Sequence, residues 1–399
     1  MRMSKRISSF QCSPIRRLVP FSREAEAKGI HVIHLNIGQP DIKTPKEALA
    51  AIHSFEPETI AYGLSEGEFP LRKALVNYYL KYGVYGLGES DILITTGGSE
   101  AIQFSILTLC DPGDEIIIPE PYYTNVGTFS NIAMVNLVPV TSSIDDGFSL
   151  PPIASFAEKI GPKTRGILLC SPNNPTGHVY SRKELVALLT LCKEKDIFLI
   201  VDEVYREFCY DGQDFVSILT FPEFQDRVIC VDSFSKRFSM CGARIGALVS
   251  RNKEVVSNAL KLAQARLCPP AVEEEAATAA LSAPDEYIQG VKREYEERRN
   301  FFFDKVSRIE GVKCSLPKGA FYFVAELPIE DAEDFAVFML KEFSYEGATL
   351  MFAPAEDFYV TKGLGRNQIR LAYVLCKEEL EKAALCLEKG LEAYKSRKH

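Results

Sequence analysis

The hexapeptide Ser233-Phe234-Ser235-Lys236-Arg237-Phe238 follows the β-forming run Val228–Val231, and Arg244 lies eight residues beyond its lysine. A turn at the end of a strand presents its side chains to the crevice beyond the sheet. A lysine in that position suits Schiff-base formation, and a nearby arginine suits the binding of a phosphate group. This stretch therefore predicts a site where a lysine reacts covalently beside a bound phosphate.

The composition is that of a globular protein, with 399 residues of which 46% are hydrophobic and 25% are charged. The formal net charge is −8 and no long basic run is present, so nucleic acid is not an expected partner. No apolar stretch approaches the roughly 18 to 20 residues that cross a membrane. No apolar signal core follows the basic N-terminus, so we expect a cytoplasmic protein.

The 11 cysteines are scattered from Cys12 to Cys386 without a Cys-x-x-Cys pair. A disulfide framework or a zinc site needs tighter clustering, so we expect reduced thiols and no metal site. Cys241 lies near Lys236, but nothing in the sequence activates it, and we interpret it as structural. His178 has no metal-like spacing to another histidine and receives the same interpretation.

Short apolar runs alternate with amphipathic segments through the middle of the chain. Continuous apolar runs are typical of strands covered on both faces of a sheet. They occupy residues 91–95, 115–118, 166–170, 197–201, 227–231 and 245–249. Helical spacing marks 99–109 and 181–194, with Ser99 and Ser181 as the expected N-caps. The alternation predicts an α/β fold with a mostly parallel sheet flanked by helices.

The pattern changes after Pro269-Pro270. Two helices are expected first, followed by strands mixed with further helices, which predicts a second, smaller α+β domain. The expected helices are 271–283, 286–309, 331–342 and one from Lys377 onward, and the expected strands are 319–326, 349–352 and 368–374.

Three further motifs accompany Lys236 and Arg244: Asn173-Asn174-Pro175-Thr176-Gly177, Val201-Asp202-Glu203-Val204-Tyr205 and Ile369-Arg370-Leu371. Together and in this order, the motifs resemble the fold-type I aminotransferases that use pyridoxal 5'-phosphate (PLP). The similarity is to the class I/II, aspartate aminotransferase-like family. It runs from about Asn36 to Arg370.

The resemblance implies a large PLP-binding domain over residues 45–275. The N-terminal segment 1–44 is then expected to pack with residues 276–399 as the small domain.

Amino-group transfer needs a covalent handle, a base and an electron sink. By resemblance, Lys236 holds PLP as a Schiff base and then shuttles the α-proton of the substrate. Asp202 ends an expected strand and would keep the pyridine ring protonated. Glu203 should face elsewhere, because neighbouring residues of an extended segment point in opposite directions.

The remaining cofactor contacts are also implied by the resemblance. Asn174 and Tyr205 would hydrogen-bond the phenolic oxygen of the ring, which favours its anionic form. Tyr123 matches the position whose ring stacks on the pyridine, although the adjacent Tyr122 could take this place instead.

The phosphate needs backbone donors and cationic side chains. Gly98 and Ser99 lie where a strand meets a helix, and the N-terminus of a helix binds anions. By resemblance, Ser233 and Arg244 complete the phosphate site. Tyr62 matches the tyrosine that reaches the phosphate of the partner subunit, which implies a homodimer with shared active sites.

Substrate recognition needs a cation for the α-carboxylate. Arg370 matches the family's carboxylate clamp, and a guanidinium binds a carboxylate through two parallel hydrogen bonds. Gly38 resembles the loop that closes over this carboxylate, and Asn174 is expected to contact the substrate as well.

These residues predict a PLP-dependent aminotransferase that moves the amino group of an L-amino acid to a 2-oxo acid. Aspartate and 2-oxoglutarate are the first expectation, with Arg266 as a candidate for the distal carboxylate. Aromatic, alanine or broad specificity and a cysteine-conjugate β-lyase activity stay open. A nucleotide-binding dehydrogenase is not expected, since no Gly-x-Gly-x-x-Gly turn follows an early strand.

Overall fold

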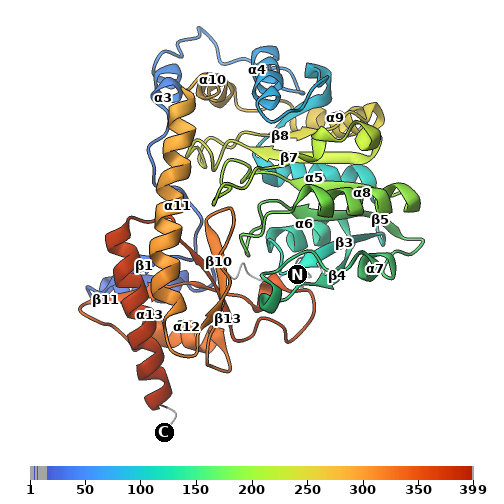
Figure 1. Ribbon diagram of the computed structural model, residues 1–399. Coiled ribbons are helices and arrows are strands. Elements are labelled where there is room, and N and C mark those ends of the chain that lie inside the picture. The colour runs from blue at the N-terminus through green and yellow to red at the C-terminus, as the bar shows by residue number, and fades with distance from the viewer. Residues whose placement is uncertain (1–3, 5–6, 8–15, 398–399) are drawn as a thin grey trace.

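A seven-stranded sheet forms the centre of the computed structural model, which describes Ser4, Ile7 and residues 16–397 (Figure 1). The strand order is β2-β8-β7-β6-β5-β3-β4, and β8 runs antiparallel to both of its neighbours. The remaining neighbours pair in parallel. The strands are β2 (Ile92–Thr95), β3 (Glu115–Glu120), β4 (Asn136–Thr141), β5 (Thr164–Cys170), β6 (Phe198–Asp202), β7 (Val228–Ser233) and β8 (Gly246–Val249).

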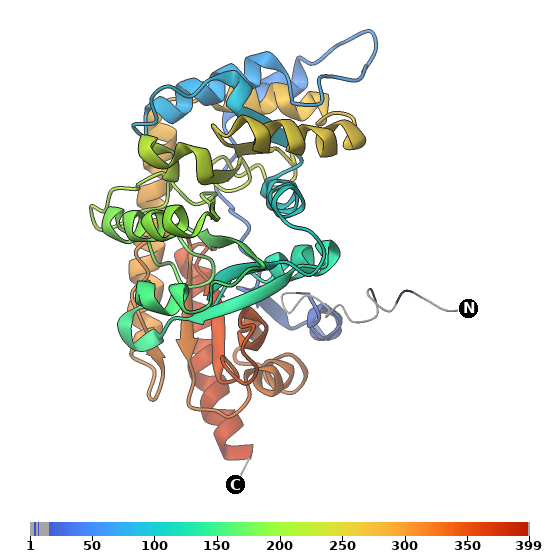
Figure 2. The same ribbon diagram turned by 90° about the vertical axis from the view of Figure 1, so that its right-hand side faces the viewer.

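Helices cover both faces of this sheet (Figures 1 and 2). They are α3 (Lys46–His53), α4 (Phe69–Leu80), α5 (Gly98–Leu109), α6 (Asn125–Ala133), α7 (Ile153–Ala157), α8 (Arg182–Lys195), α9 (Lys253–Arg266) and α10 (Ala271–Ala280). Short 3₁₀ turns lie at Glu89–Asp91, Ile144–Asp146, Ile218–Thr220, Pro222–Arg227 and Glu356–Phe358.

Alternate residues of each strand enter different apolar cores. In β6, Leu199 and Val201 pack on the side of α4, α8 and α10, whereas Ile200 packs on the side of α5, α6 and α9. Leu93 of β2 likewise faces away from its neighbours Ile92 and Ile94. Because successive side chains of a strand point to opposite faces, a continuous apolar run supplies both cores at once.

A second group of strands and helices contains α2 and α13, the first and last of the helices named here. Its sheet has the order β12-β13-β10-β9 and is antiparallel, while β1 pairs in parallel with β11. The strands are β1 (His31–His34), β9 (Lys313–Cys314), β10 (Tyr322–Glu326), β11 (Ala348–Met351), β12 (Ala353–Pro354) and β13 (Gln368–Ala372). The helices are α2 (Val19–Ala27), α11 (Asp285–Ser307), α12 (Ala332–Lys341) and α13 (Lys377–Arg397).

The predicted α/β class and mostly parallel sheet are confirmed. Ser181 caps α8 as expected, since its side chain accepts a hydrogen bond from the backbone of Glu184. The expected cap at Ser99 is wrong: Gly97 is the N-cap of α5, and its φ of 85° turns the chain directly after β2. Strand β4 was not predicted, because Pro139 interrupts its pattern; it lies at the edge of the sheet, where proline is tolerated.

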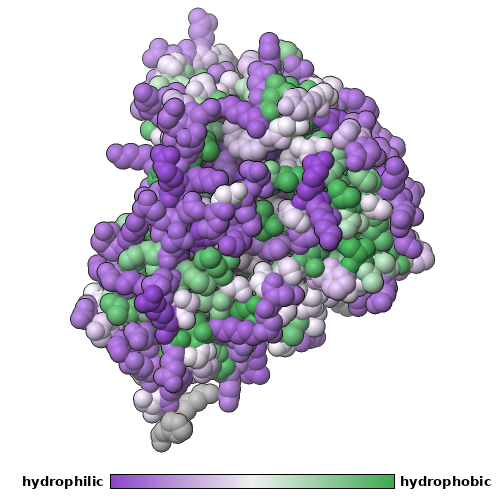
Figure 3. All heavy atoms as spheres, viewed as in Figure 1, coloured by the Kyte–Doolittle hydropathy of each residue, from purple (hydrophilic) through white to green (hydrophobic). Residues whose placement is uncertain are grey.

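The proposed domain division at residues 44/45 and 275/276 stays a prediction, and part of segment 1–44 lies outside the described residues. Within residues 16–397, together with Ser4 and Ile7, no helix has the length and apolar character needed to cross a membrane. The ten cysteines in this part of the chain are all free, and Cys12 lies outside it. Hydrophilic side chains cover much of the face shown in Figure 3.

Candidate active site

A cavity of about 690 Å³ opens at the carboxyl ends of β5, β6 and β7, where Cys170, Asp202 and Ser233 form part of its wall. Eleven of the twelve residues predicted for the site line it: Gly38, Gly98, Ser99, Tyr123, Asn174, Asp202, Tyr205, Ser233, Lys236, Arg244 and Arg370. The structure therefore brings together segments from Gly38 to Arg370.

Lys236 projects from the turn after β7 into this cavity. Its Nζ donates a hydrogen bond of 2.6 Å to the carbonyl oxygen of Gly38 and lies 3.9 Å from Sγ of Cys241. Position 38 has no space for a side chain, because a Cβ there would lie 1.5 Å from the hydroxyl oxygen of Tyr322. The glycine thus lets the backbone of this loop pack against the ring of Tyr322.

Asp202 is a buried acid at the end of β6. One carboxylate oxygen accepts a hydrogen bond of 3.2 Å from the backbone N–H of Val204. No cationic side chain of the described residues forms an ion pair with it. Burial therefore raises the pKa of Asp202 to about 7. Such a carboxylate gains most from a ligand that brings a cation or an N–H donor.

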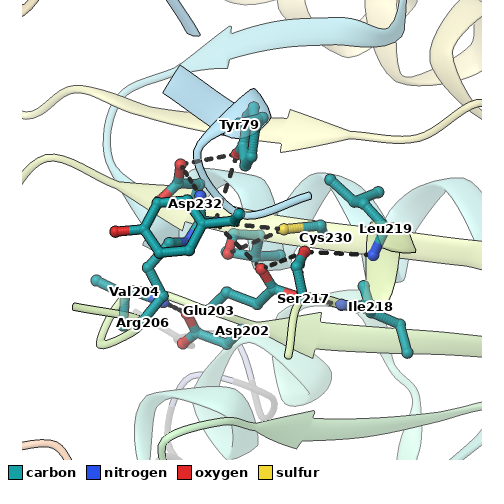
Figure 4. A network of polar contacts seen from close by, with 12 residues as sticks. Tyr79, Asp202, Glu203, Val204, Arg206, Ser217, Ile218, Leu219, Cys230 and Asp232 are labelled. Atoms are coloured by element: carbon teal, nitrogen blue, oxygen red, sulfur yellow. Dashed lines mark hydrogen bonds and ion pairs between the residues drawn. The ribbon is translucent and has the colours of Figure 1, made fainter. Parts of the chain in front are cut away.

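The adjacent Glu203 lies in a buried polar network rather than in the cavity (Figure 4). Its carboxylate accepts hydrogen bonds from the Ser217 hydroxyl and the Ile218 backbone and lies 3.2 Å from the guanidinium of Arg206. Arg206 also lies 3.4 Å from Asp232 of β7. The prediction that Glu203 faces away from the Asp202 site agrees with this arrangement.

Arg237, the residue after the lysine, attaches the turn to the buried interior. The guanidinium of Arg237 donates hydrogen bonds of 2.7 and 3.2 Å to the two carboxylate oxygens of Asp232. Although burial opposes ionisation of Asp232, Arg206 and Arg237 hold its pKa at about 2. Tyr79 donates a further hydrogen bond of 2.7 Å to the same carboxylate. The turn that carries Lys236 is thus attached to the interior by a charged pair.

The end of the cavity near α5 has the features of an anion site. The backbone turns at Gly97, where a Cβ would lie 2.4 Å from the Arg244 guanidinium. A Cβ on Gly246 would likewise lie 2.7 Å from the backbone nitrogen of Gly98. Close backbone approach, the first amides of α5 and one arginine give an arrangement suited to a phosphate. Ser233 and Ser99 line the same region.

Aromatic and amide side chains form the next part of the wall. Tyr123 lines the cavity, and its hydroxyl accepts a hydrogen bond of 2.7 Å from Asn125. Tyr122 instead packs in the apolar core between the sheet and α5, which favours Tyr123 for stacking. The hydroxyl of Tyr205 lies 3.1 Å from that of Tyr322. Tyr322 was not predicted, since the run 319–326 has the pattern of an ordinary buried strand.

Arg370 is 1% exposed, and burial lowers its pKa. Its guanidinium donates to the side-chain oxygen of Asn174 at 3.1 Å and to the carbonyl of Asn36, and it lies 4.5 Å from the ring centroid of Tyr322. Within the described residues, no carboxylate forms an ion pair with it. A buried cation without an anion is suited to binding a carboxylate ligand.

Two residues considered from the sequence lie outside the cavity. Tyr62 is 80% exposed. The guanidinium of Arg266 lies 3.2 Å from Glu100 and donates to the carbonyl of Ser65 at 2.9 Å.

His178 lies 3.4 Å from Glu184, and Cys241 lines the cavity beside the lysine. Sequence reasoning also missed Arg16, which lines the cavity from the segment before α2.

Comparison with known proteins gives the family. Residues 30–385 match the model of "Aminotransferase class I and II". The chain is 31% identical over 396 residues to a putative aminotransferase, YugH, of Bacillus subtilis, covering 98% of both chains. It is 28% identical to an aspartate aminotransferase of Geobacillus stearothermophilus, covering 98% of this chain and all of that one. A solved alanine aminotransferase from Pyrococcus furiosus superposes with a TM-score of 0.89 at 30% identity, covering 98% and 100% of the two chains.

The chain belongs to the class I and II aminotransferases. It is an aminotransferase enzyme with the aspartate aminotransferase-like fold, and this family is PLP-dependent. The residues of the cavity fit PLP: Asp202 is a buried acid without a cationic partner among the described residues, and the glycine turn at α5 brings backbone amides and the Arg244 guanidinium close together, as a phosphate requires. Lys236 provides a primary amine in the same cavity.

Proposed function

We propose that this enzyme uses PLP to transfer the amino group of an L-amino acid, with aspartate as the first candidate, to a 2-oxo acid such as 2-oxoglutarate. One observation carries the proposal. An amine (Lys236), a buried acid without a cation (Asp202) and a buried arginine without a carboxylate (Arg370) line one cavity.

Each of these groups has a separate task in the proposed reaction. When bound, PLP supplies an electron sink that stabilises negative charge at the substrate Cα. The carboxylate of Asp202 holds a proton on the ring nitrogen, an interaction that its buried position strengthens. The first amides of α5, with Ser99, Ser233 and Arg244, hold the phosphate.

Lys236 is the tether and the base. Its Nζ would accept the proton from the substrate Cα and later return it within the same site. In the structure Nζ donates a hydrogen bond to the carbonyl oxygen of Gly38, which places the amine next to the loop at Gly38. Arg370 binds the α-carboxylate through its planar fork, with Asn174 beside it. Tyr123 would stack on the cofactor ring, and Tyr205 would donate a hydrogen bond to its phenolic oxygen.

We further propose a homodimer with shared active sites. Exposed apolar side chains surround Tyr62 along the chain: Ile60, Leu64 and Phe69 are 69%, 45% and 49% exposed. Several large apolar side chains exposed within one short segment support burial of this segment against another chain. Tyr62 would then reach the phosphate of the partner subunit. The cytoplasmic location stays a prediction from the sequence.

Transfer to an oxo acid and β-elimination use similar residues but different stoichiometry. Relatives of this chain include aspartate and alanine aminotransferases, which supports transfer. The test supplies purified holoenzyme with aspartate, alanine or a cysteine conjugate, with and without 2-oxoglutarate. Glutamate formation that depends on the oxo acid supports the proposal. Pyruvate released from the conjugate without any oxo acid would instead favour the lyase.

The tether can be tested independently. Borohydride reduction of the holoenzyme should fix the cofactor to one lysine, and peptide mapping should identify Lys236. A phosphopyridoxyl adduct on another lysine would contradict the assignment, and Lys236→Ala should abolish the adduct and the transamination while leaving the fold intact.

A further inference from the structure

The cavity contains one more cation than the tether, the phosphate and the α-carboxylate require. Its cationic lining residues among those described are Arg16, Lys236, Arg244 and Arg370, and its single acid is Asp202. Lys236 is the amine, Arg244 lies against the glycine turn, and Arg370 is buried beside Asn174. Arg16 is not needed for the tether, the phosphate or the α-carboxylate.

Arg16 lines the cavity, as do Ile37, Gly38 and Gln39 of the loop after β1. Its backbone carbonyl accepts a hydrogen bond of 3.1 Å from Val19 at the start of α2. Its guanidinium forms no hydrogen bond or ion pair with any residue in the described part of the chain. Within the described residues, its five N–H donors are therefore available to an anion that enters here.

The backbone around Arg16 is held by its neighbours. Arg17 donates a hydrogen bond of 3.0 Å to Glu333 of α12 and one of 2.5 Å to Asp357, and Leu18 is 1% exposed. Helix α2 packs on α12, and the two lie side by side in Figure 2. The two consecutive arginines thus have different roles, since Arg17 attaches the segment and Arg16 reaches the cavity.

Arg266, the other candidate for binding a second substrate carboxylate, already has partners within the protein. Arg266 forms an ion pair with Glu100 and donates to the carbonyls of Ser65 and Ile94. Only 15% of its side chain is exposed. Recruiting it to a substrate would leave the carboxylate of Glu100 without its partner, which is unfavourable for a side chain that is 13% exposed.

We propose that Arg16 binds the side-chain carboxylate of the substrate, and that the enzyme is therefore selective for dicarboxylic amino acids and oxo acids. The inference rests on the proposed aminotransferase function and specifies its substrate class. Arg370 binds the α-carboxylate that every amino acid carries, and Arg16 supplies the second guanidinium that only a dicarboxylate can use.

The experiment compares Arg16→Gln with Arg23→Gln in the holoenzyme. Arg23 is an exposed arginine of α2 that does not line the cavity, so it controls for the loss of a nearby positive charge. The readout is the ratio of kcat/KM for aspartate to kcat/KM for alanine. We expect Arg16→Gln to lower this ratio roughly tenfold to a hundredfold, as for loss of a charge-assisted hydrogen bond. Arg23→Gln should keep the wild-type ratio.

A binding measurement separates this inference from the proposed reaction. Calorimetry on the holoenzyme should find that succinate binds more tightly than butyrate, and that Arg16→Gln removes most of the difference. Equal losses for aspartate and alanine, or an unchanged succinate affinity in Arg16→Gln, would overturn the inference. An enzyme that transfers no amino group yet loses succinate binding on this substitution would refute the proposed reaction and support the anion site.

Discussion

Lys236 and Arg237 are consecutive residues held on opposite sides of one turn. Nζ of Lys236 donates to Gly38 in the cavity, whereas the guanidinium of Arg237 is fully buried and bound to Asp232 at 2.7 Å. A flexible lysine on an unsupported turn would sample many positions. The ion pair between Arg237 and Asp232 restricts the positions that the turn can adopt, so the amine of Lys236 is positioned by its neighbour in the sequence.

Replacing Arg237 should destabilise the fold strongly. Arg237→Met leaves the buried carboxylate of Asp232 with fewer partners, and removal of one member of a buried ion pair costs about 3–5 kcal/mol. Arg308→Met is the control, because Arg308 and its partner Asp304 are 76% and 56% exposed, and such pairs contribute under about 1 kcal/mol. Urea unfolding of both variants measures the difference. Equal effects would contradict the role of the buried pair.

The buried acid of β6 should make the stability of the apoprotein depend on pH. Its folded pKa of about 7 lies above the unfolded value of about 3.9. Below about pH 4 both states are protonated; as the pH rises towards 7 the unfolded chain ionises first, so the folded state loses stability. Apoprotein carrying Asp202→Asn should exceed the wild type by roughly 4 kcal/mol at pH 8 and match it near pH 4. If the stability difference between Asp202→Asn and the wild type were constant from pH 4 to 8, ionisation of Asp202 would not be its cause.

The same substitution should impair the holoenzyme. Asp202→Asn should retain cofactor but lose most of its turnover, because an amide cannot hold a ring proton by charge. Glu203 cannot replace it, since Ser217, Ile218 and Arg206 engage its carboxylate. Turnover is compared with PLP content measured by absorbance. Near-normal turnover would show that another acid performs this task.

Arg370→Lys keeps the charge of the carboxylate clamp but removes its fork. We expect kcat/KM to fall by the equivalent of roughly 2–3 kcal/mol for aspartate, alanine and phenylalanine alike, because all three carry the α-carboxylate. A defect confined to aspartate would show that Arg370 instead reads the side chain.

Shared active sites predict rescue between two inactive chains. Mixing Tyr62→Ala with Lys236→Ala subunits should generate one site per heterodimer with both native residues, if Tyr62 acts on the partner. Activity after subunit exchange should then exceed that of either parent. No gain in verified heterodimers would place Tyr62 outside the partner's site.

The parts of the fold that the sequence predicted are those with a local pattern. Continuous apolar runs identified β2, β3, β5, β6, β7 and β8, because each buries both of its faces. Strand β4 lies at the edge of the sheet and carries Pro139, so its pattern is weaker. The direction of β8, antiparallel in an otherwise parallel sheet, depends on the path of the chain through the turn at Lys236 and has no signature in its own residues.

The residues of the site were likewise predictable only where they belong to a local sequence motif. Motif residues such as Asp202 and Lys236 were predicted, and they line the cavity. Arg16 and Tyr322 were missed because only the packing of the N-terminal segment and of β10 brings them there. Neither has a local motif: Arg16 is one of two adjacent arginines, and Tyr322 belongs to an aromatic strand.

Because side chains alternate along β6, the number of residues in this strand determines which acid faces the cavity. Asp202 faces the cavity and Glu203 the buried guanidinium of Arg206 because consecutive residues along an extended segment point in opposite directions. Inserting one residue into β6 would exchange these directions and offer the glutamate to the cofactor. We therefore expect evolution to tolerate changed side chains in this strand far more readily than a changed number of them, and to confine insertions to the loops.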